Sequence, residues 1–384
     1  MVFGLSIYRD RVRRATEVAA SRGLAGLILT RPSSIFYVAG FVHMPTPERP
    51  LCAVLPADGD PFLLTPAVEY GHAKSKSWFN DVRQWYFDLP SGEQPFKSLA
   101  KMLGEAKMVG KSIGLEDTSV IDALRKEMPG TTLLNAKDII WRLRMIKSNE
   151  EIELMREHAA YADFALGAVK DSIQEGITEL EIVGKAVQKT LFKMSKEVQN
   201  MDGPMPVNVR VVAGARTAFP HAFSGTSKSK RGDEILAVVI TTAYGYECGE
   251  IARTFFFGEP SEEKMRLYVA ASKGMALVMK AMRPGVKCSE LHRINCEHLA
   301  RSGYAGHYPV KTGTMRGLES RDGVYLSELD QTVLEPGMTF FVGSGICIPG
   351  KGGYRLGEMV LVTETGAESL HKFPSNIQSV TIRA

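Results

Sequence analysis

Hydrophobic and polar residues follow helical and strand-like patterns in turn along the first third of the chain. "RDRVRRATEVAASRG" carries an amphipathic pattern that ends at Gly23, which predicts a helix. "LAGLILT" is a short apolar run typical of a buried strand, and "LCAVLPADGDPFLLTP" predicts two strands joined by an Asp-Gly turn. "KSIGLED" predicts another strand, followed by a helix over "DTSVIDALRKEM". This part of the chain therefore predicts an α/β domain.

The pattern changes near residue 145 to long helices separated by pairs of strands. Ser148 followed by Glu151 fits a capping box at the start of a long helix. The strand pairs "GDEILAVVITTAYGYECGEIARTFFFG" and "PGMTFFVGSGICIP" with "GGYRLGEMVLVTETG" leave no room for crossover connections, so we predict antiparallel pairing and an α+β domain. The predicted helices cover residues 149–172, 178–195, 261–282 and 288–302. We place the two domains at residues 1–144 and 145–384.

Composition narrows the class of protein. A chain of 384 residues exceeds one ordinary core, and its net charge of +4 is scattered, which argues against a nucleic-acid partner. No apolar run reaches the roughly 18 residues of a membrane helix, and the first residues lack the apolar centre of a signal peptide. The five cysteines include no C-x-x-C pair, which indicates reduced thiols. We therefore expect a cytoplasmic protein that binds neither nucleic acid nor membrane.

Several segments of the second part, taken in order, resemble the pita-bread superfamily of creatinase, prolidase, aminopeptidase P, methionine aminopeptidase and ectoine hydrolase. They are "RMIKSNEEIELMR", "FPHAFSG", "RGDEILAVV", "ARTFFFG", "RPGVKCSEL", "TVLEPGMTFFVGSGICIPGKGGYR" and "VLVTETGAE". The resemblance extends more weakly to the first part. It implies an α+β fold in which a pita-bread catalytic domain follows a smaller α/β creatinase-type domain. It also implies a homodimer whose active site is shared between subunits.

The resemblance implies a metal site that this chain does not retain. The peptidases of the superfamily hold two metal ions with two Asp, one His and two Glu, because hard cations prefer several carboxylate ligands. Only one carboxylate stands at the matching positions, and one carboxylate cannot hold a pair of metal ions. We therefore predict no metal and no cofactor, a character closest to creatinase, and no Xaa-Pro metallopeptidase activity. The matching positions are Val239, Glu250, Thr314, Gly343 and Gly357.

The candidate catalytic residues are His221 and Glu250. His221 matches the catalytic His of creatinase, and an imidazole can act as base and then acid near neutral pH, although a lone His can also simply pack or cap. The two substrate-facing Glu residues of creatinase fall on Ala252 and Gly343. Glu250 lies two residues before Ala252 on the same strand face and is the candidate replacement. A regular strand would point Glu247 to the opposite face, outside the site.

The candidate substrate-binding residues are two arginines, a histidine and a threonine. Arg49 and Arg321 resemble the arginines with which creatinase binds its substrate, the first belonging to the small domain of the partner subunit. A planar guanidinium binds a carboxylate through two parallel hydrogen bonds, whereas a solvated surface position is the alternative for each. His307 and Thr314 lie near the lost metal ligand and are further candidates.

Together these residues predict a metal-independent hydrolase that cleaves a C–N bond, of amidine, ureido or amide type, in a small amino-acid-like molecule with a carboxylate. His221 would move the proton. An inactive pita-bread protein that serves as a binding module and a metal-free lyase remain as alternatives. Away from the catalytic pair, we expect Arg355 and Glu358 to form a structural ion pair and consider Cys347 for the pocket floor.

Overall fold

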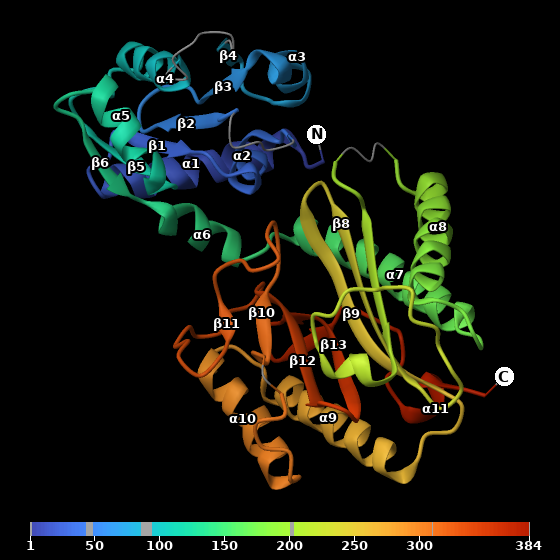
Figure 1. Cartoon of the computed structure of the whole chain (residues 1–384). Helices are drawn as coiled ribbons and strands as arrows, with labels where there is room; N and C mark the ends of the chain where they lie inside the picture. Colours follow the sequence, from blue (N-terminus) through green and yellow to red (C-terminus); the bar gives the residue numbers. More distant parts are fainter. Residues whose placement is uncertain (1, 44–48, 86–93, 200–202, 309, 384) are drawn as a thin grey trace. The chain divides into compact units, whose positions relative to one another are not determined.

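Two separate β-sheets organise the chain in the computed structural model (Figure 1). One belongs to a compact unit of residues Met1–Arg144, which we call unit 1, and the other to Met145–Ala384, which we call unit 2. Each unit has helices and a sheet of its own, which confirms the predicted α+β class with a smaller α/β domain first. The structure describes residues 2–43, 49–85, 94–199, 203–308 and 310–383.

Unit 1 is built on a mixed six-stranded sheet with the order β4-β3-β2-β1-β5-β6. β5 is parallel to both β1 and β6, while β2 is antiparallel to both β1 and β3. The predicted Asp-Gly turn joins β2 to β3, and Gly59 takes a left-handed φ of 114° that a side chain would disfavour. The strands are β1 (Gly26–Leu29), β2 (Cys52–Pro56), β3 (Phe62–Pro66), β4 (Asp81–Trp85), β5 (Ser112–Leu115) and β6 (Thr132–Asn135).

The helices of unit 1 close its apolar core. The first helix ends before Gly23, whose φ of 72° stops it where the sequence predicts. Buried side chains of β1, β2, β3 and β5 pack with those of the helices into one cluster that includes Ile28, Val54 and Leu115. The helices are α1 (Leu5–Ser21), α2 (Pro32–Ala39), α3 (Ala67–Lys76), α4 (Gln94–Glu105), α5 (Ile121–Glu127) and α6 (Lys137–Met145), with a short 3-10 turn at Thr118–Val120.

Unit 2 is built on a nine-stranded sheet whose main path is β11-β10-β12-β13-β9-β8-β7. Long antiparallel pairs form its centre, as the spacing of the strand pairs predicts. β14 adds to β13 and β15 adds to β9. The strands are β7 (Val207–Ala213), β8 (Glu234–Ala243), β9 (Tyr246–Phe257), β10 (Gly313–Met315), β11 (Tyr325–Leu326), β12 (Thr339–Ile348), β13 (Gly352–Val362), β14 (Ala367–Ser369) and β15 (Thr381–Ile382).

Helices pack against one face of this sheet. α7 lies on β8 and β9, α8 on β7, and α9 on β12 and β13. The capping box of Ser148 and Glu151 begins α7 as predicted, with the Ser148 hydroxyl accepting from the Glu151 N–H and the Glu151 carboxylate accepting from the Ser148 N–H. The helices are α7 (Asn149–Ser172), α8 (Glu179–Glu197), α9 (Glu262–Ala281), α10 (Cys288–Arg301) and α11 (Ile377–Val380), with a 3-10 turn at Gly214–Ala218.

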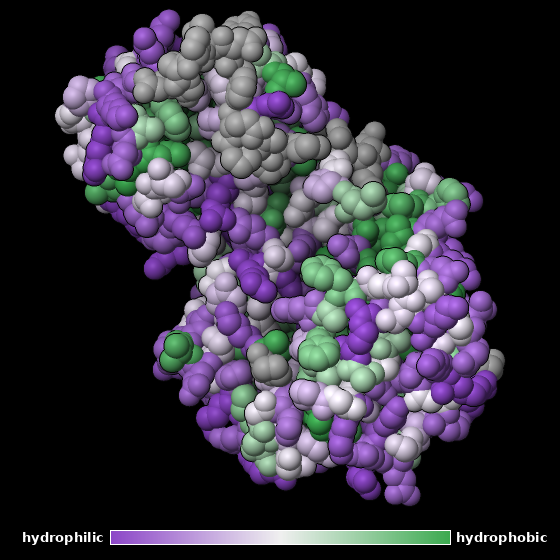
Figure 2. Space-filling model, in the orientation of Figure 1, coloured by the Kyte–Doolittle hydropathy of each residue, from purple (hydrophilic) through white to green (hydrophobic). Residues whose placement is uncertain are grey.

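The surface is mostly hydrophilic, with apolar groups gathered between β8 and α8 on the visible face of unit 2 (Figure 2). α8 contributes two of the exposed large apolar side chains, Leu180 and Phe192. Across the part of the chain that the structure describes, every helix is too short or too polar to cross a bilayer.

A buried arginine joins the middle of the sheet to the C-terminal segment. Arg253 is 1% exposed, and its guanidinium donates to Glu358 at 2.5 Å and to the carbonyl oxygens of Gly357 at 3.1 Å and Phe373 at 3.0 Å. Glu358 therefore pairs with Arg253. The predicted pair of Glu358 with Arg355 is wrong, because two residues three positions apart on a regular strand point to opposite faces.

We expect Glu358→Gln to lower the free energy of unfolding by about 3 to 5 kcal/mol, because it leaves a buried guanidinium without its counter-charge. Urea unfolding followed by circular dichroism measures the change. Glu368→Gln is the matched control, since Glu368 forms an exposed pair with Arg156 that is worth about 1 kcal/mol or less. If both variants lost the same free energy of unfolding, the buried pair would contribute no more to stability than the exposed one.

Candidate functional site

The floor of the site is a row of residues that crosses five strands on the sheet face that opens into a pocket. Neighbouring members pair directly across the strands. Three of them have hydrogen or methyl side chains, and the ring of Phe341 packs above two of these, Gly343 and Gly357. In order across the sheet, the row is Arg210, Val238, Ala252, Gly357 and Gly343.

Above this floor lies a pocket of about 860 Å³ whose walls belong entirely to unit 2. It brings together four of the predicted site residues: His221, Glu250, Thr314 and Arg321. Those four come from the loop after β7, from β9, from β10 and from the loop after β10. The volume lies within the range of pockets that enclose small molecules.

A guanidinium holds the carboxylate of Glu250. Arg316 donates one hydrogen bond to Glu250, one to Glu247 at 3.1 Å and one to the carbonyl oxygen of Ser320. Glu250 is 4% exposed and Arg316 is 9% exposed, so neither charge is solvated well enough to stand alone. Sequence reasoning missed Arg316, although its place two residues after Thr314, directly behind the short strand β10, is the signal that could have found it.

Glu247 lies in the same pocket as Glu250, so the prediction that it points outside is wrong. The reason is a β-bulge between β8 and β9. Thr241 pairs with Gly249 whereas Thr242 pairs with Glu247, which leaves Cys248 as an extra residue. The extra residue changes the alternation of faces and turns both carboxylates to the same side. Burial raises the pKa of Glu247 to about 7, against the lowering effect of the nearby Arg316 charge.

The raised pKa of Glu247 predicts a specific dependence of stability on pH. A carboxyl whose pKa is higher in the folded than in the unfolded protein stabilises the fold at low pH, and this contribution is lost as pH rises from 4.5 to about 7. We therefore expect the wild type to lose stability over this range relative to Glu247→Gln, which does not titrate. Urea unfolding between these two pH values and above measures the difference.

Glu262→Gln serves as the control for this experiment, because Glu262 lies on α9 with its side chain 85% exposed. A stability difference between wild type and Glu247→Gln that stays constant across the pH range would contradict the assignment.

His221 is placed by a buried carboxylate outside the pocket. Glu179, which is fully buried at the start of α8, accepts hydrogen bonds from the backbone N–H groups of Ala213 at 2.9 Å and Gly225 at 2.7 Å. Arg216 donates to Glu179 at 2.5 Å and to the Phe223 carbonyl at 2.7 Å. These contacts fix both ends of the loop that carries His221.

The imidazole of His221 is exposed at the pocket wall. Partial burial lowers its pKa, and the positive charges of Arg210, Arg355 and Arg321 lower it further, while Glu250 raises it. Near neutral pH the ring is therefore largely uncharged, and it can accept a hydrogen bond or a proton from a ligand.

The positions that match the metal ligands do not fit a pair of metal ions. Val239 lies in the core under the opposite face, and its neighbour Ile240, which pairs with Glu250 and lines the pocket, offers no ligand either. A Cβ atom added to Gly357 would lie 2.1 Å from Cζ of Phe341. The ring of Phe341 thus fills the space that a glutamate side chain at Gly357 would need.

A second glycine gives the same result. A Cβ atom at Gly343 would meet the Leu356 carbonyl at 3.0 Å and the Phe341 ring at 3.1 Å. Among the residues that the structure describes, no group of three or more His, Cys, Asp or Glu side chains is arranged to hold a metal ion. The described residues therefore offer the family's metal pair no ligand set beyond Glu250, which is paired with Arg316.

We expect Glu250→Gln to leave the binding of Mn²⁺ unchanged, because a single carboxylate held by a guanidinium is a poor ligand for a hard cation. Isothermal titration of chelator-treated protein with Mn²⁺ measures the stoichiometry, and circular dichroism checks that the variant is folded. Glu262→Gln again provides the control. One or two equivalents of bound Mn²⁺ that disappear only in Glu250→Gln would contradict the fit drawn from the side chains.

The remaining predicted residues lie outside the pocket walls. His307 does not line the pocket, and its carbonyl accepts from the Cys347 N–H at 2.7 Å. Cys347 does not line it either, and burial raises the pKa of its thiol to about 11, which disfavours a nucleophile. Arg49 is exposed and belongs to unit 1, so the structure of unit 2 does not test its predicted role.

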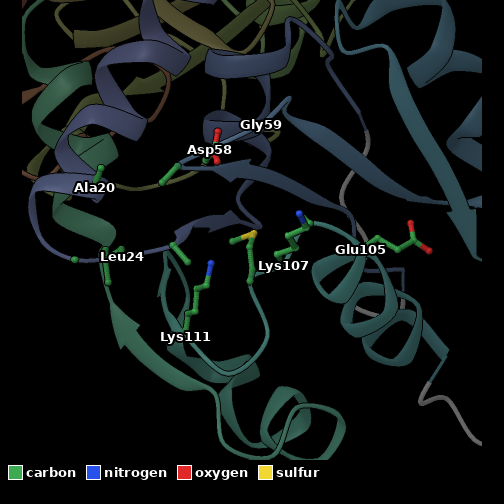
Figure 3. A pocket seen from close by; sticks show the side chains of 12 residues that line it. Ala20, Leu24, Asp58, Gly59, Glu105, Lys107 and Lys111 are labelled. Carbon is green, nitrogen blue, oxygen red and sulfur yellow. The ribbon is translucent and has the colours of Figure 1, made fainter.

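A second hollow, of about 670 Å³, lies in unit 1 and is lined by the segments around Leu24, Asp58 and Lys107 (Figure 3). Its labelled charged side chains stand apart and do not converge on a common centre. It contains neither a histidine nor a cysteine. The convergent chemistry of the described residues therefore lies in the pocket of unit 2.

Comparison with known proteins identifies the family. Residues 153–364 match metallopeptidase family M24, and residues 11–146 match the creatinase/prolidase N-terminal domain. The first match alone covers more than half of the chain. The chain belongs to metallopeptidase family M24. This confirms the predicted superfamily, whose members share the pita-bread domain behind a creatinase-type domain.

Several relatives of this M24 protein are named as dipeptidases. A probable dipeptidase PepE from Mycobacterium tuberculosis is 29% identical over 99% of this chain and 98% of its own length. An Xaa-Pro dipeptidase from Pyrococcus furiosus is 27% identical over 95% of this chain and 98% of its own length. The crystal structure of the dipeptidase PepE from Mycobacterium ulcerans superposes with a TM-score of 0.85, covers 99% of this chain and 100% of its own, and is 26% identical.

These similarities contradict the predicted function. The sequence predicted a metal-independent, creatinase-like hydrolase for small C–N bonds, whereas the relatives carry the names of dipeptidases and the family is one of metallopeptidases. Neither the inactive binding module nor the lyase gains support from them. The chain thus belongs to a family of metallopeptidases, while the side chains described above do not fit a pair of metal ions. These are two separate findings.

Proposed function

We propose that this M24 protein acts on dipeptide-sized substrates as a hydrolase, in the pocket of unit 2. One observation carries the proposal: over almost its full length the chain is similar to proteins named dipeptidases, and its pocket lies within the part that matches the family. The pocket volume of about 860 Å³ suits a small ligand. The walls offer guanidinium groups and an uncharged imidazole, which are suited to bind a carboxylate and to exchange a proton.

Each side chain has a part in this proposal. Arg321, exposed at the pocket wall, binds the carboxylate of the substrate through paired hydrogen bonds. Thr314, whose hydroxyl is buried without a hydrogen-bond partner, orients the substrate through one hydrogen bond. His221 exchanges a proton with the substrate, and the negative charge of Glu250, fixed by Arg316, stabilises positive charge that develops nearby.

The proposal also covers the oligomeric state of the protein and its location in the cell. We propose a homodimer in which Arg49 contributes to the site of the other subunit, as the resemblance to creatinase implies. We also propose a cytoplasmic location, which the absence of disulfides among all five cysteines supports.

The proposal is tested with a panel of dipeptides that includes Xaa-Pro sequences, measured with chelator and with added Mn²⁺. We expect one class of dipeptide to raise the melting temperature and to release free amino acids, which chromatography detects. His221→Asn should lower the rate of release by about 100-fold or more while the shift in melting temperature remains, because a positioned proton carrier contributes this much.

His307→Asn is the matched control, since His307 lies outside the pocket walls and its loss should leave the rate unchanged. Unchanged release by His221→Asn would contradict the role of the imidazole. Binding of dipeptides without release under both metal conditions would contradict hydrolysis, and the absence of both would contradict the proposed substrate.

A further inference from the structure

The charges around the pocket of unit 2 do not balance. Its walls carry two carboxylates, those of Glu247 and Glu250, and Arg316 pairs with both of them. Three more arginines line the same pocket, and none has a carboxylate partner among the residues that the structure describes. They are Arg210, Arg321 and Arg355. With Lys311, which also lines the pocket, the described walls therefore carry more positive than negative charge.

Arg355 is the most constrained of these cations. It is 8% exposed, its backbone is tied to the Thr254 hydroxyl at 2.9 Å, and its guanidinium lies over the Phe341 ring at 5.5 Å from the ring centre. Its Nε atom is buried without a hydrogen-bond partner. An unsatisfied buried donor costs stability, so the structure keeps Arg355 in a state that a bound acceptor would improve.

Arg210 stands on the other side of the pocket floor. It lies on β7 and pairs with Val238 on β8, so its side chain rises from the same face as Ala252 and Gly357. Burial lowers the pKa of Arg210 and the charge of Arg355 lowers it further, while the charge of Glu250 raises it, so Arg210 lies within electrostatic reach of both groups. Two like charges facing one space in a pocket favour an anion between them.

The two arginines approach this space from different strands. β7 and β13 are separated by β8 and β9, which corresponds to roughly 14 Å between their backbones at the usual strand spacing. Between them the pocket is bounded by Val238 and by the ring of Phe341, which lies over Gly357. A single carboxylate at Arg355 would leave Arg210 unneutralised, whereas a ligand with an anionic group at each end would satisfy both.

We propose that this pocket selects a small ligand with two anionic groups, one bound by Arg355 and the other by Arg210, and that Arg321 shares in binding the carboxylate that lies at the exposed edge. Resting on the proposed function, this makes the preferred substrate a dipeptide with an acidic side chain, whose side-chain and C-terminal carboxylates supply the two charges. The same geometry accepts phosphate-bearing molecules, since a guanidinium binds both groups through paired hydrogen bonds.

Isothermal titration of the full chain with matched ligands tests the inference. The ligands are Ala-Glu and its neutral counterpart Ala-Gln, together with succinate and inorganic phosphate. We expect Ala-Glu to bind at least about tenfold more tightly than Ala-Gln, because one additional charge-assisted hydrogen bond in a buried site is worth about 1.5 kcal/mol or more. The preference should weaken at high salt, since it arises from charge.

Variants assign the preference to particular side chains. Arg210→Met should abolish the difference between Ala-Glu and Ala-Gln, while Arg210→Lys retains part of it. Arg293→Met is the control, because Arg293 is an exposed residue of α10 that pairs with Glu297. If Arg210→Met fails to fold by circular dichroism, the ligand series and salt dependence of the wild type decide the question without it.

The outcomes separate this inference from the proposed function. Equal affinity of wild type for Ala-Glu and Ala-Gln, with either dipeptide cleaved, would overturn the inference and leave the dipeptidase proposal standing. Binding of succinate or phosphate in an Arg210-dependent manner, with no dipeptide bound, would support the anionic pocket and overturn the dipeptide proposal. Failure of every anion to bind would overturn the inference on its own.

Discussion

The pocket of unit 2 depends on one interaction, the contact of Arg316 with Glu247 and Glu250. Two carboxylates that are buried side by side repel each other and lose hydration, so they need a cation. Here the guanidinium of Arg316 contacts both carboxylates. The other three arginines of the pocket still outnumber the negative charge that remains, so they are available to bind a ligand.

The shape of the pocket follows from side chains that are absent as much as from those that are present. Ala252, Gly343 and Gly357 have small side chains, which leaves room for the ring of Phe341 above the centre of the sheet. The guanidinium groups of Arg316 and Arg355 pack against this ring. Glu179 and Arg216 then fix the loop of His221 beside it. The floor of the pocket thus depends on small residues, its wall on contacts between arginines and an aromatic ring, and the loop of His221 on a buried ion pair.

The sequence predicted the fold well because its signals are local. The capping box of Ser148, the stop at Gly23 and the strand pairs around β8 and β9 depend on neighbouring residues, and the structure confirms them. The gathering of His221, Glu250, Thr314 and Arg321 in one pocket was also accessible, through the resemblance to a known superfamily.

The rest of the site depended on contacts between distant residues. The bulge at Cys248 moved Glu247 into the pocket, and no local pattern marks one extra residue in a hairpin. The partner of Glu358 is Arg253 and not the nearby Arg355, which freed Arg355 for the pocket. Arg210 could have been predicted as a pocket residue. It follows Asn208 by two positions in an otherwise apolar strand, so both side chains lie on the same face. The predicted function was wrong for another reason. It gave more weight to the metal ligands missing at the matching positions than to the similarity of the whole chain to peptidases.

The Phe341 ring also constrains how this protein can change over evolutionary time. Because the ring occupies the volume beside Gly357, a mutation that introduced glutamate there would place its Cβ atom against the ring. Phe341 would have to shift or become smaller, and Arg316 would then lose an aromatic neighbour. Positions 341 and 357 are therefore coupled: which residues one of them tolerates depends on the residue at the other.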